Sequence, residues 1–163
     1  MYTNVSKFFI LFFSLFILAI SFPTHAQDDI EYVEMDTLRE KISEDKKIIV
    51  GLNMNLTKAE EKEFWPIYES YQDELHKINV RLLAVIKDYA SAYNQGPVSN
   101  EKAEDLLKES IAIDWEEVKL KERYISIFGK VLPIAKVARY IQIENKIRAV
   151  IRYQIADGLP LLD

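Results

Sequence analysis

The chain has 163 residues, a formal net charge of −5 at pH 7, two histidines and no cysteine. The absence of cysteine excludes a disulfide framework and a cysteine nucleophile, and it argues against a zinc site, which relies on Cys and His ligands. The acidic balance argues against nucleic acid as a partner, because phosphate backbones attract basic surfaces.

The N-terminal segment has the layout of a secretory signal peptide. Lys7 precedes an apolar run from Phe8 to Phe22, and a polar stretch then leads to the small residue Ala26. The run is shorter than the about 20 residues that a transmembrane helix needs. We expect residues 1–26 to be cleaved off after Ala26, with an uncleaved anchor as the alternative. Residues 27–163 would then form a single helical domain that is periplasmic or secreted and has no stable membrane insertion.

The first helix of this domain is expected over Leu38–Val50. Thr37 and Glu40 fit a capping box, in which a hydroxyl and a carboxylate satisfy backbone amides at a helix start. Apolar residues then recur at helical spacing, and Gly51 supplies a C-terminal stop. A short connector over Leu52–Leu56 would lead to the second helix.

The second helix has the strongest periodic pattern in the sequence. Thr57 and Glu60 form another capping box at its start, and Asn94-Gln95-Gly96-Pro97 marks its end. Between them, apolar residues are spaced alternately four and three apart, which is the heptad seam of a coiled coil. The seam consists of Phe64, Tyr68, Tyr71, Leu75, Ile78, Leu82, Val85 and Tyr89. We expect the seam to be core, and Trp65, about 100° away on the helix, to be the aromatic residue available to a partner.

The third helix is expected over Asn100–Lys130, capped by Ser99, and it carries two apolar stripes. The first stripe consists of Leu106, Ile113, Leu120 and Ile127. The second consists of Leu107, Ile111, Trp115, Val118 and Ile125. Together they span roughly 200°, whereas one buried face needs little more than about 100°. We expect the first stripe to be core and the second to be covered by another subunit or left for client proteins, with an exchange of roles as the alternative.

The fourth helix is expected from Pro133, which suits a first helical position, to Ala156, with Gly158 and Pro160 ending it. Its cations are Lys136, Arg139, Lys146, Arg148 and Arg152. We expect Arg139, Arg148 and Arg152 to pair with internal acids or to face solvent, with the binding of carboxylates as the alternative. An apolar tail, Leu159–Leu162, is expected to fold back on the domain.

No segment has the pattern of a β-hairpin or a βαβ unit. The sequence therefore predicts an all-α fold, a four-helix, elongated, hairpin-like arrangement whose long second and third helices carry the heptad pattern. Asp73 and His76 share a helix face as in half of a metal site, but residues 27–163 contain no second histidine, so we expect a solvated pair. There is no phosphate-binding loop and no nucleophile motif. We expect no enzyme, no cofactor and no metal.

An internal echo relates two of the expected helix starts. The first copy is Leu56-Thr57-x-x-Glu60-x-x-x-Phe64. The second copy is Leu132-Pro133-x-x-Lys136-x-x-x-Tyr140. Leu56, Thr57 and Glu60, with Glu where the motif has Gln, resemble the motif of the LTXXQ periplasmic proteins of the Spy and CpxP type. The second copy departs from that motif at both Thr and Gln.

The resemblance implies an ATP-independent periplasmic helical protein that dimerises into a curved cradle and binds unfolded proteins or an envelope-stress sensor. We therefore predict a homodimeric, chaperone-like protein of the stress response that holds unfolded or envelope proteins. The holding surface would comprise Trp65, Leu107, Ile111, Trp115 and Val118. The alternative is a structural or regulatory interaction protein of the envelope-stress response with one fixed partner.

Overall fold

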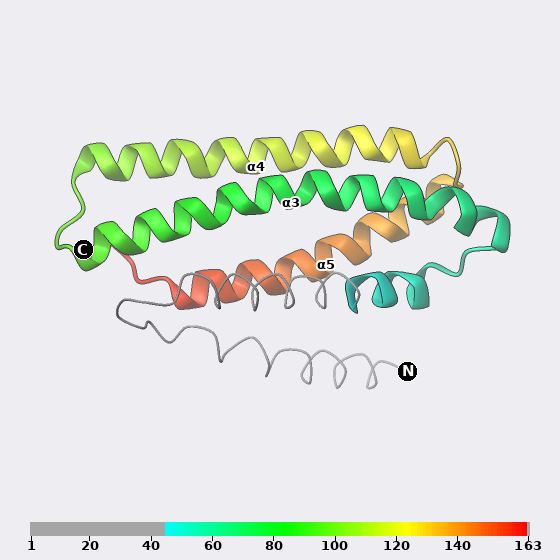
Figure 1. Cartoon of the computed structure of the whole chain (residues 1–163), viewed down its shortest axis with the longest axis horizontal. Helices are drawn as coiled ribbons and strands as arrows, with labels where there is room; N and C mark the ends of the chain where they lie inside the picture. Colours follow the sequence, from blue (N-terminus) through cyan, green and yellow to red (C-terminus); the bar gives the residue numbers. More distant parts are fainter. Residues whose placement is uncertain (1–44, 163) are drawn as a thin grey trace, which may run out of the picture. The chain divides into compact units, whose positions relative to one another are not determined.

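The computed structural model describes residues 45–162. A helix covers residues 45–54, and it is followed by α3 (Lys58–Asn94), α4 (Asn100–Phe128) and α5 (Ile134–Gly158). No strand occurs within residues 45–162. Figure 1 shows α3 and α4 as a long antiparallel hairpin, with α5 returning along it. This confirms the predicted all-α, hairpin-like fold; the expected signal peptide and the Thr37 capping box lie outside the described residues.

The connector before α3 is shorter than predicted, because Gly51 does not stop the helix. Residues 51–54 remain helical, and the backbone turns at Asn55, whose φ of 49° lies in the left-handed region that asparagine tolerates. Gly51 lies under an indole: a Cβ at this position would be 3.6 Å from Cζ2 of Trp65. This is an ordinary van der Waals distance, so the helix packs beside the Trp65 ring at Gly51 without requiring a glycine there.

α3 begins with the predicted capping box. The Thr57 hydroxyl accepts a hydrogen bond from the Glu60 amide (3.3 Å), and the Glu60 carboxylate accepts one from the Thr57 amide (2.7 Å). The helix ends where Gly96 adopts a φ of 129°, which a side chain would disfavour. The seam is buried from Phe64 to Ile78, whereas Leu82, Val85 and Tyr89 are only half-buried. The heptad pattern thus marks core along the first part of α3 and a partly exposed flank along the rest.

α4 turns the first apolar stripe inward, as predicted. Ser99 caps the helix, its hydroxyl accepting a hydrogen bond from the Lys102 amide (3.2 Å). Ile113 and Leu120 are buried, and Leu106 and Ile127 are half-buried. The roles of the two stripes are therefore not exchanged.

α5 starts one residue later than predicted, with Pro133 as the N-cap, and continues to Gly158. The two copies of the internal echo meet in space: Nζ of Lys136 lies 2.5 Å from Oε2 of Glu60, and the rings of Phe64 and Tyr140 have centroids 5.4 Å apart. Equivalent positions of the two helix starts thus pair with each other.

The C-terminal tail folds back without being buried. The Tyr89 hydroxyl donates a hydrogen bond to the carbonyl oxygen of Pro160 (2.7 Å), which ties the tail to α3. Leu161 and Leu162 nevertheless stay exposed. The tail is therefore attached through its backbone, with Leu159 half-buried, and Leu161 and Leu162 add little to the core.

The core is dominated by aromatic rings from three helices. The cluster consists of Phe64, Tyr68, Tyr71, Tyr124, Phe128 and Tyr140. Phe128 and Tyr140 are the closest pair, with centroids 4.8 Å apart and planes at 61°. The backbones of α3 and α4 approach closely, whereas α5 stays farther away and is joined to them by large side chains. This spacing leaves room between α4 and α5 for a polar site.

Candidate functional site on the outer face of α4 and in the groove beside α5

The second apolar stripe of α4 is exposed. We call Leu107, Ile111, Trp115, Val118 and Ile125 the outer stripe; all five side chains are exposed in this structure. The contrast within one helical turn is large, because Ile113 is 0% exposed whereas Ile111 is 49% exposed. α4 therefore presents apolar side chains on the face opposite to its core stripe.

Trp65 does not join this surface. It lies on α3 and packs edge-to-face on Phe64 and Tyr68, with ring centroids 5.0 Å and 5.3 Å away. Nζ of Lys47 sits 5.2 Å from its ring centroid, and Gly51 lies beside its edge. Trp65 is half-buried and packs against residues 45–54, so it is not part of the exposed surface of α4.

The three motif residues have structural contacts. Leu56 packs against the core cluster, and Thr57 caps α3. Hydrogen bonds from the Lys136 ammonium and the Thr57 amide lower the pKa of Glu60 to about 2. These contacts join the beginnings of α3 and α5.

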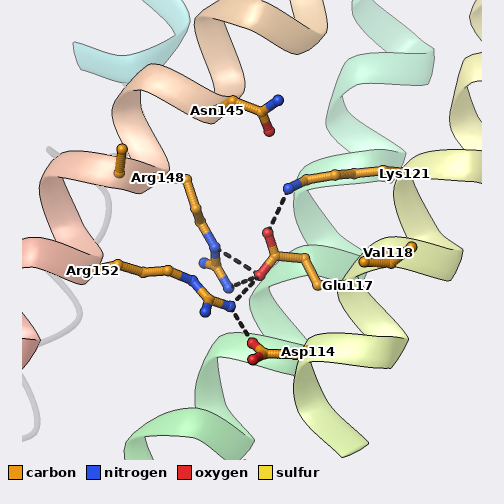
Figure 2. Close-up of a pocket in the computed structure, with 8 residues that line it drawn as sticks. Asp114, Glu117, Val118, Lys121, Asn145, Arg148 and Arg152 are labelled. Atoms are coloured by element: carbon orange, nitrogen blue, oxygen red, sulfur yellow. Dashed lines mark hydrogen bonds and ion pairs between the residues drawn. The ribbon is translucent and has the colours of Figure 1, made fainter. Parts of the chain in front are cut away.

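A buried carboxylate lies between α4 and α5. Glu117 is 3% exposed and Arg148 is 7% exposed. Nε of Arg148 donates a hydrogen bond to Oε2 of Glu117 at 2.8 Å. Lys121 reaches Oε1 at 2.7 Å, and Nη2 of Arg152 reaches Oε2 at 3.0 Å (Figure 2). Arg148 also donates to Oδ1 of Asn79 on α3. The carboxylate thus joins α4 to α5 through charge-assisted hydrogen bonds, and Arg148 extends the network to α3.

The surrounding cations keep this carboxylate ionised. Burial alone would raise the pKa of Glu117, but hydrogen bonds from Lys121 and Arg148 outweigh it and lower the pKa to about 2. Glu117 therefore carries its charge at any pH above strongly acidic conditions.

The network forms the floor of an open groove of about 460 Å³. Its lining residues are Asp114, Glu117, Val118, Lys121, Asn145, Arg148, Ala149 and Arg152. Val118 belongs both to this groove and to the outer stripe, so the apolar face and the cationic groove are continuous. We call this hollow the α4–α5 groove.

Two of the three arginines expected to pair with internal acids do so, whereas Arg139 donates to the carbonyl oxygen of Asn53 (2.6 Å). The carboxylate at the centre of this pairing, Glu117, was not predicted. Arg148 and Arg152 pair with Glu117, and Lys136 pairs with Glu60. Glu117 lies four residues after Ile113 and three before Leu120, so it occupies the core stripe of α4. A carboxylate at a core position is the sequence signal that could have revealed the buried ion pair.

A second buried carboxylate holds the first described helix in place. Glu144 of α5 is almost fully buried and lies 2.5 Å from Nζ of Lys46, which also donates to Gln72 (2.8 Å). Nε2 of Gln72 donates to Glu144 (3.3 Å) and to the Tyr140 hydroxyl (3.2 Å). Residues 45–54 are therefore attached to α3 and α5 by a polar network.

Among the described residues, the buried hydroxyls of Tyr68 and Tyr71 have no hydrogen-bond partner, which yields a stability prediction. The Tyr71 hydroxyl is buried and has no hydrogen-bond partner within residues 45–162, whereas the Tyr124 hydroxyl donates to Glu74 at 2.7 Å. Because an unpaired buried hydroxyl costs free energy, we expect Tyr71→Phe to be neutral or to stabilise the protein by about 1 kcal/mol, and Tyr124→Phe to cost about 1 kcal/mol. Urea denaturation of both variants measures this. A loss above about 1 kcal/mol in Tyr71→Phe would show that its hydroxyl is hydrogen-bonded in solution.

The described residues offer no metal site and no membrane-spanning helix. No group of three or more His, Cys, Asp or Glu side chains within residues 45–162 could hold a metal ion, so Asp73 and His76 gain no third ligand there. No helix in the same range is long and apolar enough to cross a bilayer.

Comparison with known proteins assigns no family to this chain. The sequence matches no protein-family model and no curated protein, and the fold matches no solved structure.

Proposed function

We propose that this protein is an exported, periplasmic, chaperone-like binding protein that holds non-native segments of other proteins on the outer stripe of α4. The observation that carries the proposal is the exposure of the whole outer stripe beside a buried core stripe. Removing apolar surface from water contributes roughly 25 cal/mol of favourable free energy per Å². A stripe of this kind can therefore hold apolar segments weakly and reversibly without consuming a nucleotide.

Two features of the sequence support the proposed compartment and class. The apolar run from Phe8 to Phe22, followed by Ala26, supports export. The Leu-Thr-x-x-Glu start of α3 supports the resemblance to LTXXQ-motif proteins, and its capping box gives the motif a physical role at a helix start.

A second candidate function is an interaction protein with one fixed helical partner. Ile111, Val118 and Ile125 are seven residues apart on the exposed face. Such spacing suits continuous packing against another helix, including α4 of a second copy in a homodimer. This candidate differs from the first because the stripe would be covered permanently.

The test pairs two charged substitutions on opposite faces of α4. We expect Ile111→Glu to leave stability within about 0.5 kcal/mol of the original, as for most surface substitutions, but to lose the suppression of client aggregation. Ile113→Glu places a charge in the core and is expected to unfold the protein. The measurements are thermal melting, light scattering of two unrelated aggregating clients, and mass in solution, on protein purified after export.

The outcomes separate the two candidates. Full anti-aggregation activity in a folded Ile111→Glu variant would contradict the holding function. If the original protein suppresses neither client, and Ile111→Glu lowers the solution mass, the fixed-partner function with a second copy takes its place.

A further inference from the structure

The α4–α5 groove contains cationic donors that its own carboxylates leave unused. Three cations and two carboxylates line it. Arg152 contacts both acids through one nitrogen, Nη2, at 2.6 Å from Oδ1 of Asp114 and 3.0 Å from Oε2 of Glu117. A guanidinium has five N–H donors. All of the Arg152 contacts within residues 45–162 are made by Nη2, so Nε and Nη1 of Arg152 have no partner there. The Arg152 side chain lines the groove and is 42% exposed.

Apolar residues line the same groove as these donors. Val118 and Ala149 line the groove, and Val118 is 52% exposed and belongs to the outer stripe. Figure 2 shows Arg148 and Arg152 extending from α5 towards Glu117, with Val118 on the α4 side. A ligand that enters the groove from the outer stripe would therefore meet an apolar contact and a guanidinium together.

A second hollow, on the α3 side of α4, shows that charge alone does not distinguish the groove. Its lining residues are Glu74, Lys77, Ile78, Glu116, Lys119, Leu120 and Arg123, with a volume of about 440 Å³. It too has three cations and two carboxylates. Its apolar residues, however, are buried in the core and offer no exposed contact. Exposed apolar residues, together with guanidinium donors that have no partner within residues 45–162, distinguish the α4–α5 groove from this second hollow.

We propose that the α4–α5 groove binds a carboxylate that neighbours an apolar side chain in a peptide segment, with the carboxylate on Arg152 and the apolar side chain on Val118. The carboxylate belongs to an Asp or Glu side chain or to the C-terminus of a polypeptide. This inference rests on the proposed holding function and specifies which segments the protein prefers. Acidic groups next to apolar residues would be held more tightly than equally apolar neutral segments.

The test compares three labelled peptides with the same apolar residues by fluorescence anisotropy. One contains an internal Glu and an amidated end, the second replaces the Glu with Gln, and the third is the Gln peptide with a free C-terminal carboxylate. We expect the carboxylate peptides to bind about 10-fold more tightly than the neutral one, which corresponds to the lower end of the range for a hydrogen bond to a charged group. The preference should disappear in 1 M salt, where the screening length falls to about 3 Å.

Matched variants assign the preference to one groove. Arg152→Gln is expected to abolish the preference while leaving the affinity for the neutral peptide unchanged, and Arg152→Lys is expected to retain part of it. Arg123→Gln removes the same charge from the second hollow and should leave the preference intact. Melting curves confirm that each variant is folded, which the exposure of both arginines favours.

The results separate this inference from the function on which it rests. Equal binding of all three peptides by the original protein, or a preference that survives Arg152→Gln, would overturn the carboxylate site but leave the holding function in place. Binding of none of the peptides, together with no suppression of client aggregation, would overturn both. A preference for one carboxylate peptide over the other identifies whether the source is a side chain or a C-terminus.

Discussion

Replacing Glu117 with leucine is expected to destabilise the protein by about 3–5 kcal/mol, because it leaves the buried guanidinium of Arg148 without its anion. Glu117 and Arg148 are only 3% and 7% exposed, so water cannot replace the lost partner. Chemical denaturation followed by circular dichroism measures the change. The double variant Glu117→Leu with Arg148→Met removes both charges and is expected to regain most of the loss.

The dependence of the unfolding free energy on pH under acidic conditions provides an independent check on the Glu117–Arg148 pair. The pKa of Glu117 in the fold is about 2, below its ordinary value of 4.5. Its stabilisation is therefore complete above about pH 4.5 and is lost as the pH falls towards 2. Glu117→Gln should show a shallower dependence of unfolding free energy on pH in this window. A Glu117→Leu variant as stable as the original protein would contradict the buried ion pair.

Replacing Phe128 with alanine is expected to cost about 3–5 kcal/mol, the range for removing a buried aromatic ring and leaving a cavity. Phe128 is 0% exposed, and its ring centroid lies 4.8 Å from that of Tyr140 and 5.3 Å from that of Phe64. The ring joins the end of α4 to both neighbouring helices. Thermal and urea unfolding measure the loss.

Trp115→Ala is the matched control, because it removes an aromatic ring from the exposed face of the same helix. We expect it to change stability by no more than about 0.5 kcal/mol. A loss as large as that of Phe128→Ala would contradict the exposure of the outer stripe in solution and would indicate that a second subunit covers it.

The helices and their starts follow from local patterns. The capping boxes, the Gly96 turn and the seam of α3 depend on residues close in sequence, which is why the bounds of α3, α4 and α5 were predicted to within a few residues. Gly51 is the exception. Its local stop signal is overridden: residues 51–54 remain helical and bury Met54, which is 1% exposed, and the turn comes at Asn55.

The candidate site was predicted only in part. The apolar arc of α4 showed that one stripe would lack an intramolecular cover, and this stripe is now located. Trp65 was assigned to the same surface because helical spacing gives its angle on α3 but not the neighbouring helix that lies against it. Lys47 and Gly51, in the helix over residues 45–54, lie against the Trp65 ring and cover part of it.

By itself, the sequence determined an all-α protein with two long, heptad-patterned helices, because periodicity and capping act over one or two turns. Only the tertiary structure decided that Ile113 faces the core and Ile111 faces solvent, and that Glu117 meets Arg148 across the groove. The physical reason is distance along the sequence: burial and ion pairing depend on where α5 returns beside α4, and no local pattern in either helix specifies that position.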